Sequence, residues 1–121
     1  MGDYRELLAW QRARALANAV YLATEHFPIR ERFGLAAQMR RAAISVVSNI
    51  AEGESRGSDR ELRRFLQIAR GSLGELQSQI TIARDLQLIA DESAHALAQA
   101  AADTGRVIYG LLRAYTPRRL P

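Results

Sequence analysis

The two histidines are the side chains of this sequence best suited to metal binding or general acid–base catalysis, and both have acidic neighbours. His26 follows Glu25, and His95 lies three residues after Glu92. The second pair has the Glu-x-x-His spacing with which di-iron bundles hold their metals, but such sites need a second copy and further glutamates at mid-bundle. The copy present here falls in an expected first helical turn, where acidic residues already favour the helix dipole. We therefore expect no metal site and no cofactor.

Nucleophilic catalysis also lacks its usual groups. The chain has no cysteine, which excludes thiolate nucleophiles, disulfides and thiolate metal sites. Ser45, Ser48 and Ser72 fall on expected helices with no histidine at a comparable height, and a serine nucleophile needs a base within hydrogen-bond reach. The segment 53–57 contains two glycines but lacks the Lys-Ser/Thr that completes a phosphate-binding loop. These patterns predict a protein that is not an enzyme.

Arginine is the residue type with the clearest chemical potential. All 17 basic residues are arginine and the formal net charge is +4. Guanidinium groups bind phosphates and carboxylates in bidentate fashion. A helical hairpin around residues 53–57 would place Arg40 and Arg41 level with Arg70, and Arg63, Gln67 and Arg70 on one side of the following helix, a strip suited to phosphate and sugar. The predicted nucleic-acid-binding residues are Arg40, Arg41, Arg56, Arg60, Arg63, Arg64 and Arg70.

A less specific interpretation of the same arginines stays open. Glu52, Glu61 and Glu75 lie near enough in the sequence to pair with several of them, as on an ordinary solvated helix face. Trp10 and Phe65 are expected in the core, so few aromatic rings remain for base stacking and backbone contact is favoured over base readout. The alternative to nucleic-acid binding is a protein-interaction or structural scaffold, with an unrecognised enzyme as a third possibility.

The elements that would position these side chains are helices. Proline occurs only at positions 28, 117 and 121, and alanine and leucine dominate the composition of the 121-residue chain. No segment of useful length alternates with the period of a strand. Apolar periodicity and stop signals predict helices near residues 3–26, 31–52, 58–88 and 91–116.

Several residues at the expected helix ends have capping chemistry. Asp3 with Glu6, and Ser58 with Glu61, have the spacing of capping boxes. Gly53 is expected as a left-handed C-cap of the second helix and Asp91 as the N-cap of the fourth. Because the connections are short, sequential helices should pack antiparallel. The sequence predicts one all-α domain, an antiparallel up-down four-helix bundle over residues 1–116, with 117–121 as a short flexible tail.

The expected core consists of one apolar stripe on each helix. The stripe of the third helix is the strongest periodic signal in the chain. Its members are Leu62, Phe65, Leu66, Ala69, Leu73, Leu76, Ile80 and Ala83. On the other helices we expect Trp10, Ala13, Ala17, Val20 and Tyr21; Leu35, Met39, Ala42, Val46 and Ile50; and Ala94, Leu97, Ala98, Ala101, Val107 or Ile108, Leu111 and Tyr115.

The second helix also carries a second apolar face. Residues 42–51 contain no charge, and Ile44, Val47 and Ala51 point away from the inner stripe, which predicts a contact with another subunit. Gly71 and Gly74 lie off the stripe of the third helix, where each costs about 1 kcal/mol relative to alanine unless close approach requires it. A wide core helix and tolerated surface glycines are the alternatives. The predicted subunit interface is Ile44, Val47, Ala51, Gly71 and Gly74.

Membrane association is not expected from this sequence. No apolar run approaches the roughly 20 residues that cross a bilayer. The first residues lack the basic and apolar regions of a signal peptide. We therefore expect a cytoplasmic location.

Several segments, in order, carry a family resemblance that covers roughly residues 4–85. The Asn-Ile-Ala-Glu-Gly motif at 49–53 is specific, whereas the last helix matches only in length and pattern. The other segments are Tyr4-Arg5-Glu6-Leu7, Trp10-Gln11-Arg12-Ala13, Phe27-Pro28, Glu31-Arg32-Phe33-Gly34-Leu35, Gln38-Met39-Arg40-Arg41-Ala42-Ala43-Ile44-Ser45, and Phe65-Leu66-Gln67-Ile68-Ala69-Arg70-Gly71-Ser72-Leu73. The chain resembles the four-helix-bundle family of proteins encoded in intervening sequences of bacterial 23S rRNA genes.

This resemblance carries expectations of its own. The accessory variability determinant of diversity-generating retroelements is similar to the same family. The resemblance implies a four-helix bundle that assembles as a homopentamer and has no established catalytic residues. The retroelement branch implies nucleic acid and a reverse transcriptase as partners. It supplies no binding motif that can be carried over residue by residue.

Overall fold

The computed structural model describes residues 3–115, and these residues form an all-α structure. Within that range there are four α-helices, two short 3-10 turns and no strand. The fold class predicted from the sequence is therefore confirmed. The predicted tail at 117–121 lies outside the described residues. The elements are η1 (Tyr4–Glu6), α1 (Leu8–Thr24), η2 (Ile29–Glu31), α2 (Leu35–Ser55), α3 (Asp59–Asp85) and α4 (Asp91–Ala114).

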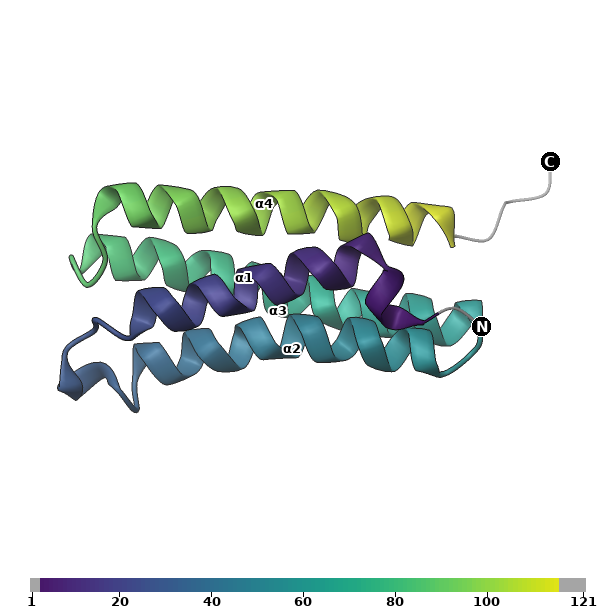
Figure 1. The fold of residues 1–121 in the computed structure, drawn as a ribbon, viewed down its shortest axis with the longest axis horizontal. Coiled ribbons are helices and arrows are strands. Elements are labelled where there is room, and N and C mark those ends of the chain that lie inside the picture. The colour runs from purple at the N-terminus through teal and green to yellow at the C-terminus, as the bar shows by residue number, and fades with distance from the viewer. Residues whose placement is uncertain (1–2, 116–121) are drawn as a thin grey trace.

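The four helices lie side by side along one long axis (Figure 1). Each helix packs on its neighbours in the sequence, and α1 also packs on α4. Each of the four helices therefore contacts two others around a shared core. Successive helices run in opposite directions: Arg40, early in α2, contacts Thr24 at the end of α1, and Gly53, late in α2, faces Leu62 early in α3. The α2–α3 pair shares the most extensive contact.

The core follows the apolar stripes closely on α3 and less closely on α1. All eight predicted residues of the α3 stripe are buried, from Leu62 to Ala83. On α1, Leu16 and Ala9 are buried, and Trp10 is half-buried and packs against the core. Tyr21 is 41% exposed, so its placement in the core was wrong. On α4 the buried set includes Thr104 and Leu112, whereas Ala98 is exposed. None of the helices within residues 3–115 is long and apolar enough to span a membrane.

The first two helices begin later than their sequence signals indicated. Asp3 caps the short turn η1 rather than α1: its Oδ1 accepts from the Arg5 amide at 2.9 Å, and the Arg5 guanidinium also binds the carboxylate. The predicted Asp3–Glu6 capping box is therefore wrong. Glu31 precedes α2, and its Oε2 accepts from the Leu35 amide at 3.2 Å. These carboxylates still serve backbone amides, as expected for helix starts.

The connection between α2 and α3 corrects the expected role of Gly53. Helix α2 continues to Ser55, and Gly53 is a buried residue within it. Gly57 instead takes the left-handed conformation, with φ of 81°. A Cβ at Gly53 would lie 2.9 Å from the Phe65 Cβ and 3.3 Å from the Leu62 Cα. Gly53 is needed for close approach of two helices and not for a turn.

The remaining helix ends agree with the sequence in part. The Ser58 Oγ accepts from the Glu61 amide at 3.1 Å, as the capping box predicts. Helix α3 ends at Asp85, before the expected Leu88, and Gln87 adopts a positive φ of 58°. Asp91 is the first residue of α4 rather than its cap, a position held by Ala90.

Close packing at Gly53 generates a stability prediction. We expect Gly53→Ala to destabilise the fold by about 1–2 kcal/mol, because overpacking against Phe65 and Leu62 outweighs the higher helix propensity of alanine. The matched control is Gly110→Ala in α4, where the Cβ position has no described atom within 4 Å apart from the glycine, its chain neighbours and the nearby backbone of its own helix, and a gain of up to about 1 kcal/mol is expected. Urea denaturation measures both. Equal effects of the two substitutions would contradict the close approach of α2 and α3.

Candidate functional site

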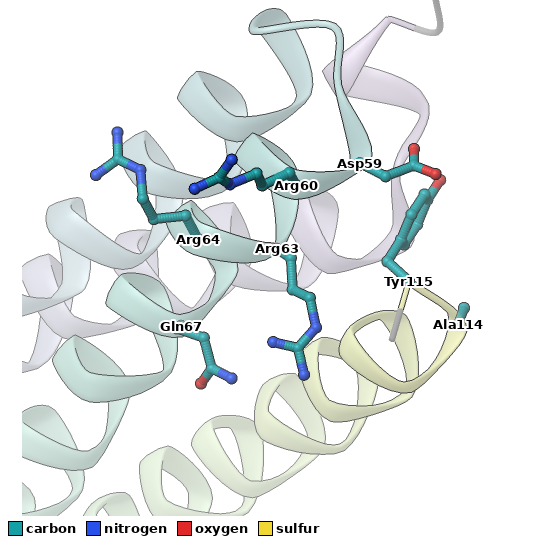
Figure 2. A pocket seen from close by; sticks show the side chains of 7 residues that line it. All are labelled: Asp59, Arg60, Arg63, Arg64, Gln67, Ala114 and Tyr115. Carbon is teal, nitrogen blue, oxygen red and sulfur yellow. The ribbon is translucent and has the colours of Figure 1, made fainter. Parts of the chain in front are cut away.

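Two hollows follow each other along the contact between α3 and α4, and together they are called here the basic groove. The first, of 680 Å³, is lined by Asp59, Arg60, Arg63, Arg64 and Gln67 of α3 and by Ala114 and Tyr115 at the end of α4 (Figure 2). The second, of 750 Å³, is lined by Arg70, Leu73, Gly74 and Gln77 of α3 and by Ala102, Gly105, Arg106, Tyr109, Gly110 and Arg113 of α4. Among these lining residues, six are arginines and Asp59 is the sole carboxylate.

Helical periodicity explains why α3 contributes a row of polar side chains to this groove. Arg63, Arg70 and Gln77 are seven residues apart, so they repeat on one side of the helix beside the buried stripe. On α4, Arg106 and Arg113 have the same spacing, and Tyr109 lies between them. The antiparallel packing then brings Arg70 to Tyr109, with the guanidinium carbon 5.4 Å from the ring centroid.

Small residues keep the second hollow open. A Cβ at Gly105 would lie 3.3 Å from the Leu73 Cδ2, so this glycine lets α4 approach α3. At Gly74 and Gly110 the Cβ position has no described atom within 4 Å apart from the glycine, its chain neighbours and the nearby backbone of its own helix. Their missing side chains therefore leave empty surface beside Tyr109 rather than a packed contact.

Only some groove arginines already hold a carboxylate. The Arg64 Nε donates to Glu61 Oε2 at 2.8 Å, and this bond lowers the pKa of the Glu61 carboxyl. Arg106 pairs with Asp103. Within residues 3–115, Arg60, Arg70 and Arg113 form no ion pair. The groove therefore carries uncompensated positive charge.

The first hollow shows how the arginines divide between two directions. Arg63 points from α3 towards the last turns of α4, whereas Arg60 and Arg64 extend away from Tyr115 (Figure 2). Arg64 also covers the Phe65 ring, with its guanidinium carbon 4.4 Å from the centroid. Arg63 therefore belongs to the interior of the hollow and Arg64 to its rim.

Three of the predicted binding arginines lie away from the groove. The Arg40 Nε donates to Thr24 Oγ1 at 2.8 Å, and its guanidinium lies 4.7 Å from the Tyr21 centroid, so it serves the contact of α1 with α2. Arg41 is exposed on α2. Arg56 donates to Glu52 Oε2 at 3.0 Å at the hairpin end.

The expected register of the α2–α3 hairpin was wrong. The hydroxyls of Ser45 and Ser72 are 2.7 Å apart, which makes Arg70 level with Val47 rather than with Arg40 and Arg41. The physical reason is that α2 continues through Gly53 to Ser55, so the turn is shorter than the expected loop at 53–57. The arginines that the structure adds instead are Arg106 and Arg113 of α4. Their spacing is visible in the sequence, but the sequence does not show that their side of α4 faces α3.

The predicted subunit-interface residues occupy two separate parts of the surface. Ile44 is 44% exposed, and Val47 and Ala51 are half-buried. Val47 follows Arg40 by seven residues, so it lies on the side of α2 that faces α1. Gly71 and Gly74 are exposed on α3, and Gly74 lines the basic groove. Self-association through these residues stays a prediction.

The histidines do not form a site with the nearby carboxylates. Within residues 3–115, no group of three or more histidine, aspartate and glutamate side chains could hold a metal ion. His26 lines an apolar hollow of 380 Å³ between α1 and α4, beside Leu22 and Leu97. His95 is exposed.

Comparison with known proteins gives the family. The family model for the 23S rRNA-intervening sequence protein matches residues 5–110. The chain belongs to this family. The resemblance to this family that the sequence motifs indicated is thereby confirmed, whereas the similarity to the retroelement determinant stays a prediction.

A solved structure supports the fold of this chain. It is the crystal structure of a protein with unknown function from the S23 ribosomal protein family of Bacteroides thetaiotaomicron VPI-5482, with a TM-score of 0.81 and 15% sequence identity. The alignment covers 88% of this chain and 96% of that one. At this identity the similarity concerns the fold alone. No functionally curated protein matches the sequence.

The location of Arg40 generates a second stability prediction. We expect Arg40→Ala to cost about 1–2 kcal/mol of unfolding free energy, because it removes the hydrogen bond to Thr24 and the contact with the Tyr21 ring. Arg41→Ala is the matched control and should change stability by less than about 0.5 kcal/mol, since Arg41 is exposed. Chemical denaturation of both variants checks this. A larger loss for Arg41 would contradict the observed placement.

Proposed function

We propose that this protein is a non-enzymatic module that binds the phosphate backbone of RNA or DNA through the basic groove. The observation that carries the proposal is the lining of the groove, where six arginines accompany one carboxylate. Arginine is well suited to phosphate because its planar guanidinium donates two parallel hydrogen bonds. The net charge of +4 adds long-range attraction for a polyanion.

The shape of the groove fits a chain-like ligand better than a small anion. Residues 60 to 77 of α3 line it, and at about 1.5 Å per residue this segment is roughly 25 Å long. Neither hollow has a histidine or serine among its lining residues, so the groove offers no imidazole base to activate a hydroxyl nucleophile. This composition supports binding without catalysis.

The proposed function predicts a salt-sensitive affinity that depends on particular arginines. We expect the double substitution Arg70→Gln with Arg113→Gln to weaken binding of a labelled oligonucleotide about tenfold at low salt. The slope of log K against log salt should also become shallower by roughly 1.5, since each lost phosphate contact removes about 0.7–0.9. Fluorescence anisotropy over a salt series measures both quantities.

A matched double variant separates groove binding from net charge. Arg12→Gln with Arg30→Gln removes the same charge from exposed residues of α1 and the α1–α2 connection. This control should keep most of the affinity and the original slope. Equal losses in both double variants, or binding that ignores salt, would show that the groove is not the binding surface.

Self-association is a second proposal. Ile44 supports it as an apolar side chain of α2 that is 44% exposed, and the family resemblance favours a homopentamer. Ile29 and Phe33, which are 88% and 89% exposed on the α1–α2 connection, favour the alternative of a protein-interaction scaffold, with a reverse transcriptase as one candidate partner.

The absence of cysteine suits a reducing compartment, and we place these interactions in the cytoplasm.

The self-association proposal predicts that Ile44→Glu lowers the sedimentation coefficient, because burying a carboxylate between subunits is costly. The matched control is Ile68→Glu, since Ile68 has a similar exposure of 42% but lies on α3. Sedimentation velocity measures assembly, and circular dichroism checks that both variants remain helical. An unchanged coefficient for Ile44→Glu would remove this part of α2 from the interface.

A further inference from the structure

Tyr109 has a different environment from the other aromatic side chains near arginines. It is 49% exposed and lines the second hollow of the basic groove. The guanidinium carbons of Arg70 and Arg113 lie 5.4 and 6.0 Å from its ring centroid. Gly74 and Gly110 line the same hollow and leave space next to the ring. The accessible ring of Tyr109 therefore lies between the guanidinium groups of Arg70 and Arg113 in the basic groove.

We propose that Tyr109 stacks on an unpaired base, so that the basic groove takes single-stranded nucleic acid in preference to a duplex. This inference rests on the proposed function and specifies its ligand. Proteins that bind single strands combine a cationic groove along the backbone with aromatic rings on which bases stack. In a duplex the base faces are covered by their neighbours, so Tyr109 can reach them only in a strand whose bases are free.

The contacts of Tyr109 are loose enough to be replaced by a ligand. Attraction between a guanidinium and an aromatic ring extends to about 6 Å, and Arg113 lies at that limit. Tyr21 offers a comparison, because Arg40 lies 4.7 Å from its centroid and is held there by the hydrogen bond to Thr24. Arg70 and Arg113 are exposed and form no ion pair within residues 3–115. They are thus available for phosphates while the ring receives a base.

The size of the hollow agrees with this ligand. Its volume of 750 Å³ falls within the roughly 300–1,000 Å³ of sites that enclose small organic groups. Gln77 also lines it and provides an amide for sugar or base edges. Stacking is tolerant of base identity, because every base has an aromatic face, so the structure points to a strand of little sequence preference.

The test compares three labelled ligands of equal length: oligothymidylate, an abasic deoxyribose-phosphate strand with the same number of phosphates, and a duplex, which has about twice as many phosphates. Fluorescence anisotropy is measured for the full chain, for Tyr109→Leu, and for Tyr109→Phe, which keeps an aromatic ring. Tyr21→Leu is the matched control, since Tyr21 is 41% exposed and lies outside the groove. Circular dichroism checks the fold of each variant.

We expect oligothymidylate to bind at least about fivefold more tightly than the abasic strand, and more tightly than the duplex despite the higher charge of the duplex; tighter binding of the duplex would overturn the inference. Tyr109→Leu should remove this difference, Tyr109→Phe should retain it, and Tyr21→Leu should leave it unchanged. Equal binding of the oligothymidylate and abasic strands, or a preference that survives Tyr109→Leu, would overturn the stacking inference while the phosphate-binding proposal stands. Absence of binding to all three ligands would instead overturn the proposed function, and the inference with it.

Discussion

Burial of the apolar stripe of α3 is the constraint on which the rest of this protein depends. Leu66 and Leu76 are completely buried and Leu73 nearly so. Truncation of such a residue typically costs about 2–5 kcal/mol. A one-residue rotation of α3 would expose the stripe, so its burial sets the orientation of every other side chain on the helix. Arg63, Arg70 and Gln77 face α4 for this reason, although they contribute little to the core themselves.

Contacts between α2 and α3 also fix the register of the two helices along their common axis. Gly53 allows the backbones to approach until its Cα hydrogens meet Phe65, and the hydroxyls of Ser45 and Ser72 pair farther along the same contact. Around Phe65, Arg56 and Arg64 cover the ring, and both guanidinium groups approach Glu61. These arginines stabilise the end of the hairpin. Arg70, on the side of α3 that meets α4, instead forms no ion pair within residues 3–115 and lies beside Tyr109.

The α3–α4 contact is close at its centre and open at its outer surface, and the open part forms the second hollow of the basic groove. Gly105 brings α4 near Leu73, whereas Gly74 and Gly110 leave the outer surface of the same contact empty. Helix interiors usually avoid glycine, because it costs about 1 kcal/mol relative to alanine. Gly74 and Gly110 therefore lower the stability of their helices, and they leave open surface beside the exposed Tyr109 and the unpaired Arg70 and Arg113.

By itself, the sequence determined the all-α class, the four-helix count, the buried stripe of α3 and the family, because apolar periodicity, proline positions and the Asn-Ile-Ala-Glu-Gly motif are local properties of the chain. Only the tertiary structure determined which side chains the arginines contact. Arg40 contacts Thr24 and Tyr21, whereas Arg70 and Arg113 both lie beside the Tyr109 ring. These contacts depend on the register and rotation of helices that are far apart in the sequence. The role of Gly53 was also decided in three dimensions. A glycine near a helix end indicates a turn or a close approach equally well, and only the position of Phe65 distinguishes them.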